Sequence, residues 1–315
     1  MVIASLFLGG FAYSQNIEKQ HSNNVAIFYP QAKDPYKSIY QNIMNGSHDA
    51  STKNNQVINI KQYRLKKTFD IDEIAQNLKK NNIDKVIVLG RLGLKLAKQL
   101  SKYTTTNNIE KFQIISGALP INPNGVSGIS LIADPAHLFE YLKQVAPNVK
   151  KIHVAYSKKS AWLIDLAKSA AKEKGLKLNL QQVSSTAQAV TFYKNIFSSG
   201  IANKDAIWLP FDRISSHDKI TLPYILEKAW TKEVVVFSSK PSHAKRGALF
   251  STYPDNFALG AQLLQMVQGL KQQPKQKNFA ALKSTLLAVN LRTAAHLGLK
   301  YSPKQQQLFK LTFPQ

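Results

Sequence analysis

Short apolar runs alternate with stretches of helical spacing along most of this chain. The runs are rich in β-branched and aromatic residues and have the length of buried strands. Each ends in a small polar cluster, and apolar residues at helical intervals follow it. This order predicts α/β architecture with parallel sheets covered by helices, in which ligands bind at the carboxyl ends of the strands. The clearest runs are residues 25–29, 85–90, 112–117, 152–157, 206–212 and 234–239.

The length of the chain predicts two lobes. Its 315 residues exceed the usual size of one hydrophobic core. The densest cluster of Pro, Asn and Gly is residues 118–125, which we interpret as the hinge or crossover between lobes. The expected division is residues 24–120 with 252–275 in the first lobe and 126–251 with 284–300 in the second, leaving 301–315 as an unassigned tail.

The N-terminus predicts export. Residues 1–14 are apolar and end in Ala12-Tyr13-Ser14, the small-x-small form of a signal-peptidase site, although a positively charged start is missing. The segment is too short to span a bilayer, and the alternative is a frayed apolar terminus. The chain has no cysteine, which excludes disulfides, thiol nucleophiles and a lipid on an N-terminal cysteine. We therefore expect a soluble periplasmic protein without a lipid anchor.

The formal net charge of +24 comes almost wholly from lysine. Such a surface attracts anionic membranes, polysaccharides or nucleic acids over long distances. The sequence holds no recognisable nucleic-acid-binding module, so we expect no specific nucleic-acid partner. Two interpretations remain: a solvated lysine-rich surface, or a surface that meets an anionic ligand or envelope.

Sequence motifs for catalysis are missing. The segment Gly90-Arg91-Leu92-Gly93 lacks the full dinucleotide glycine pattern, and no phosphate-binding loop occurs. The segment 125–128 has Ile129 where a nucleophile elbow needs glycine. The histidines are dispersed without metal-ligand spacing. We expect a protein that is not an enzyme and holds neither a cofactor nor a metal.

The candidate ligand site is the set of residues at the strand ends. In a two-lobed protein of this architecture, those of the first lobe face those of the second. The candidates are Tyr29, Gly90, Arg91, Ser116 and Gly117 from the first lobe and Tyr156, Ser157, Asp212, Ser238, Ser239 and Tyr253 from the second.

These residue types suit a small charged ligand. Asp212 is the acidic strand-end group of the second lobe and is our choice for a ligand ammonium, whereas Arg91 suits a carboxylate or phosphate. Helix N-termini and the hydroxyls of Ser116 or Ser157 suit a carboxylate, and the three tyrosines suit stacking. The alternative is structural: serine and glycine form turns, tyrosine fills core, and Asp212 caps a helix starting near residue 215 or 217.

Several segments resemble a known family. They include Gly125-Val126-Ser127-Gly128-Ile129-Ser130, Leu209-Pro210-Phe211-Asp212 and Tyr253-Pro254-Asp255-Asn256. The further similar segments are residues 145–156, 235–239, 246–249, 259–260 and 289–294. In this order, over roughly residues 24–299, the chain resembles the periplasmic substrate-binding components of ABC transporters, tryptophan/tyrosine type.

The resemblance implies a type I periplasmic-binding fold, with two Rossmann-like lobes joined by a three-segment hinge. It implies an exported protein that captures an amino acid or related metabolite by hinge closure and presents it to an ABC-transporter permease. One alternative is a ligand-sensing subunit for a membrane sensor kinase or cyclase. A second is an envelope or polysaccharide-binding protein that uses the basic surface.

Overall fold

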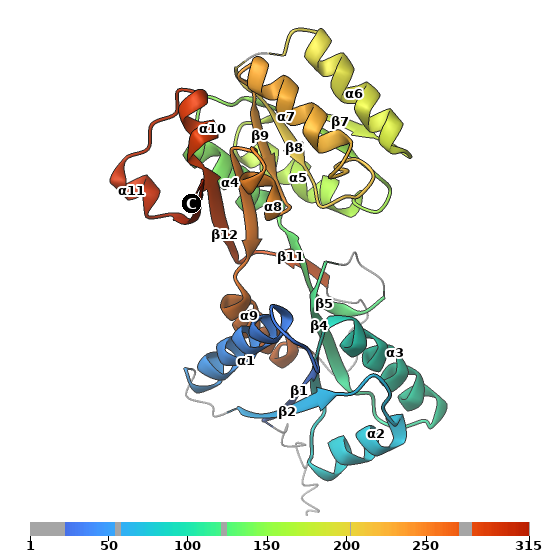
Figure 1. The fold of residues 1–315 in the computed structure, drawn as a ribbon. Coiled ribbons are helices and arrows are strands. Elements are labelled where there is room, and N and C mark those ends of the chain that lie inside the picture. The colour runs from blue at the N-terminus through green and yellow to red at the C-terminus, as the bar shows by residue number, and fades with distance from the viewer. Residues whose placement is uncertain (1–22, 54–57, 121–124, 202, 271–278, 315) are drawn as a thin grey trace, which may run out of the picture.

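The computed structural model describes residues 23–53, 58–120, 125–201, 203–270 and 279–314. The expected signal peptide, residues 1–14, lies outside them. Figure 1 shows two α/β lobes linked by extended segments, and this confirms the predicted fold class. No helix within the described ranges has the length and apolar character needed to cross a membrane.

The first lobe is built on a parallel six-stranded sheet, sheet A. Alternate strand residues face opposite sides, so Val25 and Ile27 contact one cluster while Ala26 and Phe28 contact another. Helices α1 and α9 cover the first side, and α2 and α3 cover the second. The order of sheet A is β11 (Phe279–Leu282), β5 (Ser127–Ala133), β4 (Gln113–Leu119), β3 (Lys85–Leu89), β1 (Asn24–Pro30) and β2 (Asn59–Leu65). Its helices are α1 (Tyr36–Thr52), α2 (Ile71–Lys80), α3 (Gly90–Thr106) and α9 (Asn256–Gln268).

The second lobe is built on a seven-stranded sheet, sheet B, in which only the β10–β12 pair is antiparallel among the described strands. Its core contains the fully buried Trp208 and Phe139, whose rings meet edge to face at 5.5 Å. The strand order is β13 (Phe309–Phe313), β12 (Thr285–Asn290), β10 (Phe250–Pro254), β9 (Val235–Ser238), β8 (Asp205–Leu209), β6 (Lys151–Tyr156) and β7 (Lys177–Gln182). Its helices are α4 (Pro135–Val145), α5 (Trp162–Glu173), α6 (Thr186–Ser198), α7 (Thr221–Thr231), α8 (Ser242–Lys245), α10 (Leu291–His296) and α11 (Pro303–Gln306).

Local sequence signals explain the ends of several helices. The Asp70 side chain accepts hydrogen bonds from the first backbone N–H groups of α2. Asp134 accepts from the N–H of Ala136, and Pro135 occupies the first turn of α4. Gly175 follows the end of α5 with a φ of 64°, a left-handed conformation that favours glycine.

The chain crosses between the sheets at three places, which lie side by side. They join β5 to α4, β10 to α9, and β11 to β12. The N–H of Asp134 donates to the carbonyl of Leu282 at 2.8 Å, and the N–H of Asp255 donates to the carbonyl of Ser284 at 3.1 Å. Backbone hydrogen bonds therefore tie the three segments into the expected hinge.

The hinge does not lie at the Pro- and Gly-rich stretch 118–125, and that prediction is wrong. Strands β4 and β5, on either side of this stretch, pair with each other in sheet A. Consequently residues 127–133 belong to sheet A, although the expected division placed them in the second lobe. The crossing comes one strand later, because β5 stays paired with β11 as far as Ala133. Turn-forming composition marks where a strand ends, and pairing decides where the chain goes next.

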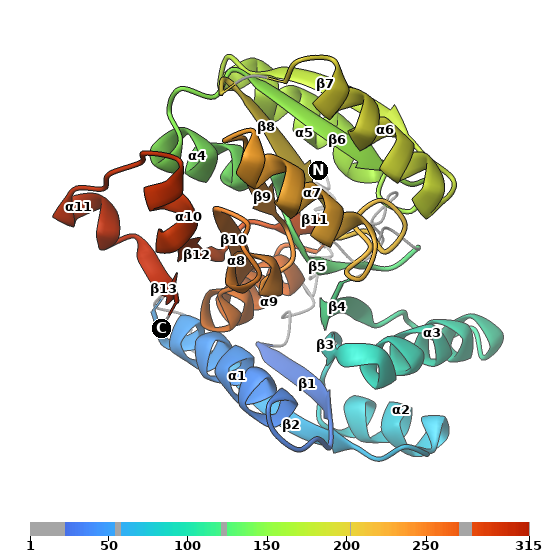
Figure 2. The same cartoon turned by 45° about the horizontal axis from the view of Figure 1, so that its top comes forward.

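Other differences concern short elements. Helix α7 begins at Thr221 and not near residue 217, because the intervening residues form a loop held by side chains. The expectations did not include the edge strand β11, the one-turn helices α8 and α11, or β13, which adds the tail to sheet B. Figure 2 shows α11 and β13 in red beside β12. These elements carry few residues, so their periodicity is weak.

Candidate ligand-binding cleft

A cavity of about 770 Å³ lies where strand ends of both sheets meet. The first lobe contributes residues at the ends of β1, β3 and β4, and the second contributes residues after β8 and β9. This is the place that parallel-sheet architecture predicts for a ligand. The lining residues are Pro30, Ala32, Tyr36, Ile39, Tyr40, Arg91, Leu92, Ala118, Leu119, Pro120, Leu131, Ala133, Phe211, Ser239, Pro241, Thr252, Tyr253, Pro254, Leu282 and Thr285.

The polar wall of the first lobe is the start of α3. No side chain caps this helix, so its first backbone N–H groups remain available at the positive end of the helix dipole. Arg91 stands in the first turn, is exposed and forms no ion pair with any described residue. Gly90 has a φ of 70°, and a Cβ there would lie 2.5 Å from the Tyr40 hydroxyl. The glycine therefore lets the tyrosine hydroxyl approach the start of α3.

The polar wall near the hinge consists of hydroxyls. Thr252 on β10 and Thr285 on β12 line the cavity, and these residues are 2% and 8% exposed. Neither Oγ1 has a hydrogen-bond partner among the described residues. Ser239 accepts a hydrogen bond from the Trp208 indole N–H at 3.1 Å. Because buried hydroxyls ordinarily have partners, the two threonines offer unused hydrogen-bonding capacity at the cleft.

Three of the residues predicted from the sequence line the cavity: Arg91, Ser239 and Tyr253. The cavity lining does not include Tyr29, Gly90, Ser116, Gly117, Tyr156, Ser157, Asp212 or Ser238. Gly117 is turned toward α9, because a Cβ there would lie 2.6 Å from a methyl group of Leu263. Ser116 donates to the carbonyl of Ser127 within sheet A.

Asp212 organises the loop after β8. Its Oδ2 accepts from the Ser157 N–H at 2.8 Å and the Ser160 hydroxyl at 2.5 Å, and its Oδ1 accepts from the N–H groups of Ile214 and Ser215. Burial raises the pKa of Asp212, but these hydrogen bonds outweigh it and hold that pKa below its usual value. The structural alternative, that Asp212 caps a helix starting near residue 215 or 217, is wrong about the helix, because α7 begins at Thr221. Asp212 instead accepts from backbone N–H groups of the loop before α7. Its pairing with a ligand ammonium stays a prediction.

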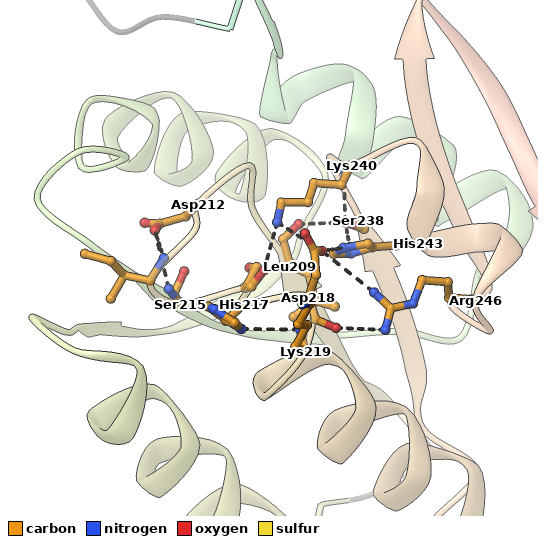
Figure 3. A network of polar contacts seen from close by, with 12 residues as sticks. Leu209, Asp212, Ser215, His217, Asp218, Lys219, Ser238, Lys240, His243 and Arg246 are labelled. Carbon is orange, nitrogen blue, oxygen red and sulfur yellow. Dashed lines mark hydrogen bonds and ion pairs between the residues drawn. The ribbon is translucent and has the colours of Figure 1, made fainter.

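A second set of contacts holds the other end of the same loop (Figure 3). The Asp218 carboxylate meets the Lys240 ammonium at 3.2 Å and His243 Nε2 at 2.8 Å. Lys240 also donates to the carbonyl of Ser216 at 2.9 Å, and Arg246 donates to the carbonyl of Asp218 at 2.7 Å. Together with Asp212, these residues fix the segment that presents Phe211 to the cavity.

Ser238, His243 and Asp218 contact one another in the order of a Ser-His-Asp catalytic triad. Ser238 Oγ lies 2.8 Å from His243 Nδ1, and His243 Nε2 lies 2.8 Å from the Asp218 carboxylate. However, Ser238 is fully buried and also hydrogen-bonds the carbonyl of Leu209 and the N–H of Lys240. A nucleophile must reach its substrate. The arrangement in this structure therefore supports the cleft wall between β9 and α8.

The burial of His243 predicts a pH-dependent stability. Burial, reinforced by the nearby Lys240 and Arg246, outweighs the hydrogen bond to Asp218 and lowers the pKa of His243 to about 4. Between pH 4 and 6.5 the unfolded chain therefore binds a proton at His243 that the folded protein does not bind. The contribution of His243 to the free energy of unfolding is complete above pH 6.5 and falls by roughly 3 kcal/mol as the pH is lowered to 4. Urea denaturation from pH 7 to pH 4.5 measures this loss.

A matched pair of variants isolates this effect. His243→Gln should be less stable at pH 7 and show a flatter pH profile between pH 7 and pH 4.5. His137→Gln, on α4 where the side chain is 39% exposed, should keep the profile of the parent protein. Burial also lowers the pKa of His153, so part of the slope should survive in His243→Gln. An unchanged slope in His243→Gln would contradict the assignment.

Sequence reasoning missed Tyr36, Tyr40, Phe211, Thr252 and Thr285 as lining residues. Phe211 and Thr252 adjoin predicted site residues, so a wider window around each strand end would have included them. Tyr40 lies in the second turn of α1 on the core-facing side and carries no local polar signal. Thr285 lies on the returning hinge strand, whose position depends on pairing with β10. The described residues contain no cluster of histidine and acidic side chains able to hold a metal ion.

Solved structures include proteins that are similar to this chain. A ligand-free, open substrate-binding protein with adhesive properties from Clostridium difficile has a TM-score of 0.55 at 15% identity, covering 89% of this chain and 96% of that one. The ABC domain from Streptococcus pneumoniae in complex with L-Trp has a TM-score of 0.49 at 19% identity, with 93% of this chain and 100% of that one covered. A conserved domain protein from Vibrio cholerae has a TM-score of 0.49 at 18% identity over the same shares.

A search of curated proteins finds no match. The sequence profile described as ABC transporter substrate binding protein matches residues 24–308, which is nearly the whole described chain. The chain therefore belongs to the ABC transporter substrate-binding protein family.

Proposed function

We propose that this protein captures a small ligand, an amino acid or related metabolite, between its lobes and presents it to an ABC-transporter permease in the periplasm. The observation that carries the proposal is the cavity of about 770 Å³ whose walls come from the strand ends of both sheets. A ligand there contacts both lobes at once. It therefore binds a closed state better than an open one, and this difference shifts the population toward closure.

A small apolar cluster at the hinge allows closure of the lobes to be detected by tryptophan fluorescence. Ile132 of β5, Ala281 of β11 and Leu163 of α5 are buried together. Trp162, the first residue of α5, meets Phe279 of β11 edge to face at 5.7 Å. The cluster joins residues of sheet A to residues of the second lobe, and so a change in the angle between the lobes alters the surroundings of Trp162.

The test is a thermal-shift screen of the full chain against amino acids, organic acids and purines, followed by intrinsic fluorescence titration. A ligand that binds only the native state at a hundred times its Kd should add about 2.7 kcal/mol to the free energy of unfolding. We expect a saturable rise in Tm and a fluorescence change with the same Kd.

Two tryptophan variants show whether the fluorescence reports the hinge. Trp230→Phe removes an indole that stacks on His296 at 3.6 Å and does not line the cleft, so the signal should persist. Trp162→Phe should abolish most of the signal while the rise in Tm remains. The absence of a saturable rise in Tm with every compound class would overturn the proposed function.

A further inference from the structure

The described lining of the cleft carries positive charge without negative charge. Among the described lining residues Arg91 is the single charged side chain, and no carboxylate accompanies it. The remaining lining is largely apolar, including Leu92, Leu131, Phe211 and Leu282. Such a cavity has a counter-charge for an anion and apolar surface for a hydrocarbon body.

The acidic residues that neighbour cleft residues in the sequence accept hydrogen bonds from backbone N–H groups. Asp134 accepts from the N–H of Ala136, and Asp255 accepts from the N–H of Ala258, each at the start of a helix. Asp34 accepts from the N–H of Ser38, and Asp212 accepts the four hydrogen bonds described above. A ligand ammonium enclosed in this cleft would lack a carboxylate partner, and burying an unpaired charge is unfavourable.

Donors converge on one end of the cavity. Arg91 and Tyr40 both line the cavity, and Arg91 follows Gly90 in the uncapped first turn of α3. The Tyr40 hydroxyl would lie 2.5 Å from a Cβ on Gly90, so it is close to the start of the same helix. A tyrosine hydroxyl is ordinarily protonated at neutral pH, and burial raises the pKa of Tyr40 further, so this hydroxyl can donate. This group of donors matches the acceptor oxygens of one carboxylate.

A second polar feature lies on the other wall. Thr252 and Thr285 present unpartnered hydroxyls that are more than nine-tenths buried, on neighbouring strands of sheet B. They lie on the hinge side, whereas the donors around Arg91 belong to the first lobe. A hydroxyl or keto oxygen on the ligand can bond to them.

We infer that the cleft binds a small organic acid with an apolar body and no ammonium group, its carboxylate held by Arg91, Tyr40 and the first turn of α3. This inference rests on the proposed function and narrows the ligand to a related acid that lacks the amine of an amino acid. The net charge of +24 favours the approach of such an anion.

The test uses pairs of probes that differ only in the ammonium group. Isothermal titration calorimetry on the full chain compares 3-phenylpropanoate with L-phenylalanine, indole-3-propanoate with L-tryptophan, and hexanoate with L-norleucine. At least one acid should bind tenfold or more tightly than its amino-acid partner. The matching methyl ester should bind at least tenfold more weakly than the acid, because it carries no negative charge.

A pair of variants locates the carboxylate. Arg91→Gln removes the cation and should weaken binding of the acid by about tenfold to about a hundredfold, the range for a hydrogen bond between charged groups. Arg91 is exposed, so Tm without ligand should be unchanged. Lys95→Gln is the matched control and should leave the affinity for the acid unchanged. Lys95 is on the same helix but does not line the cleft, and its ammonium lies 5.5 Å from the centre of the Phe69 ring.

The outcomes separate the inference from the function on which it rests. Preferential binding of the amino acids, or equal loss of affinity in both variants, would overturn the inference and leave a solute-binding protein with another ligand class. Failure of all three acids would also overturn it. Failure of every compound in the wider thermal-shift screen would overturn the proposed function itself.

Discussion

Gly260→Ala is expected to lower the free energy of unfolding by about 3 kcal/mol, which is the upper end of the usual cost of inserting an extra methyl group into a packed core. Helices α1 and α9 touch backbone to backbone at this point, side by side in Figure 2. A Cβ on Gly260 would lie 1.9 Å from the carbonyl oxygen of Ile43 and 2.8 Å from the backbone nitrogen of Ser47. Neither backbone atom can rotate away, so the helices must separate. The separation also breaks the 2.9 Å hydrogen bond from the Ser47 hydroxyl to the carbonyl of Gly260.

The sign of this prediction opposes helix propensity. Alanine favours a helix interior over glycine by up to about 1 kcal/mol, so propensity alone predicts stabilisation. Gly269→Ala at the end of α9 is the matched control, because its Cβ would lie 3.5 Å from the nearest backbone oxygen and should be tolerated. Urea denaturation of both variants gives the comparison. If Gly260→Ala is as stable as the parent protein, the close packing of α1 and α9 is wrong.

Asp212→Asn is expected to lower the free energy of unfolding by about 2 to 3 kcal/mol, the value of hydrogen bonds to a charged group. The variant keeps one oxygen for the N–H groups of Ile214 and Ser215. Its amide nitrogen cannot accept from the Ser157 N–H, which stays buried without that partner. Ligand affinity should change less than threefold, because the carboxylate does not line the cavity.

Asp165→Asn is the control for this change, because its side chain is 88% exposed on α5. Loss of its exposed ion pair and first-turn charge should lower the free energy of unfolding by less than about 1 kcal/mol. Denaturation and calorimetry on the same samples separate the two roles of Asp212. Strong loss of affinity with unchanged stability would show that Asp212 pairs with a ligand group, as the sequence analysis predicts.

The strand-end rule located the cleft better than it identified its residues. The rule selects positions after β3, β8 and β9, and each of these ends contributes to the cavity through Arg91, Phe211 or Ser239. It cannot say which neighbour of a strand end turns inward. Phe211 lines the cavity, whereas Asp212 turns toward Ser157 and Ser160, more than fifty positions earlier in the chain.

Only the structure shows how the positive charge of the chain relates to the ligand site. Sequence alone treats the net charge of +24 as a property of the whole surface. Among the described lining residues, the fold places one unpaired cation at the cleft, Arg91 in the first turn of an uncapped helix. The surface charge favours the approach of an anion, and Arg91 selects its carboxylate within the cleft.

The sequence by itself determined the α/β architecture, the order of most elements and the caps of α2 and α4. These properties depend on periodicity and on contacts within one helical turn, so they can be read from a short window. Only the tertiary structure decided where the chain crosses between lobes, which strand-end side chains face the cavity, and why Gly46 and Gly260 must stay small. The physical reason is distance along the chain: a Cβ on Gly46 would lie 1.8 Å from the carbonyl oxygen of Phe257, a contact that no local pattern encodes.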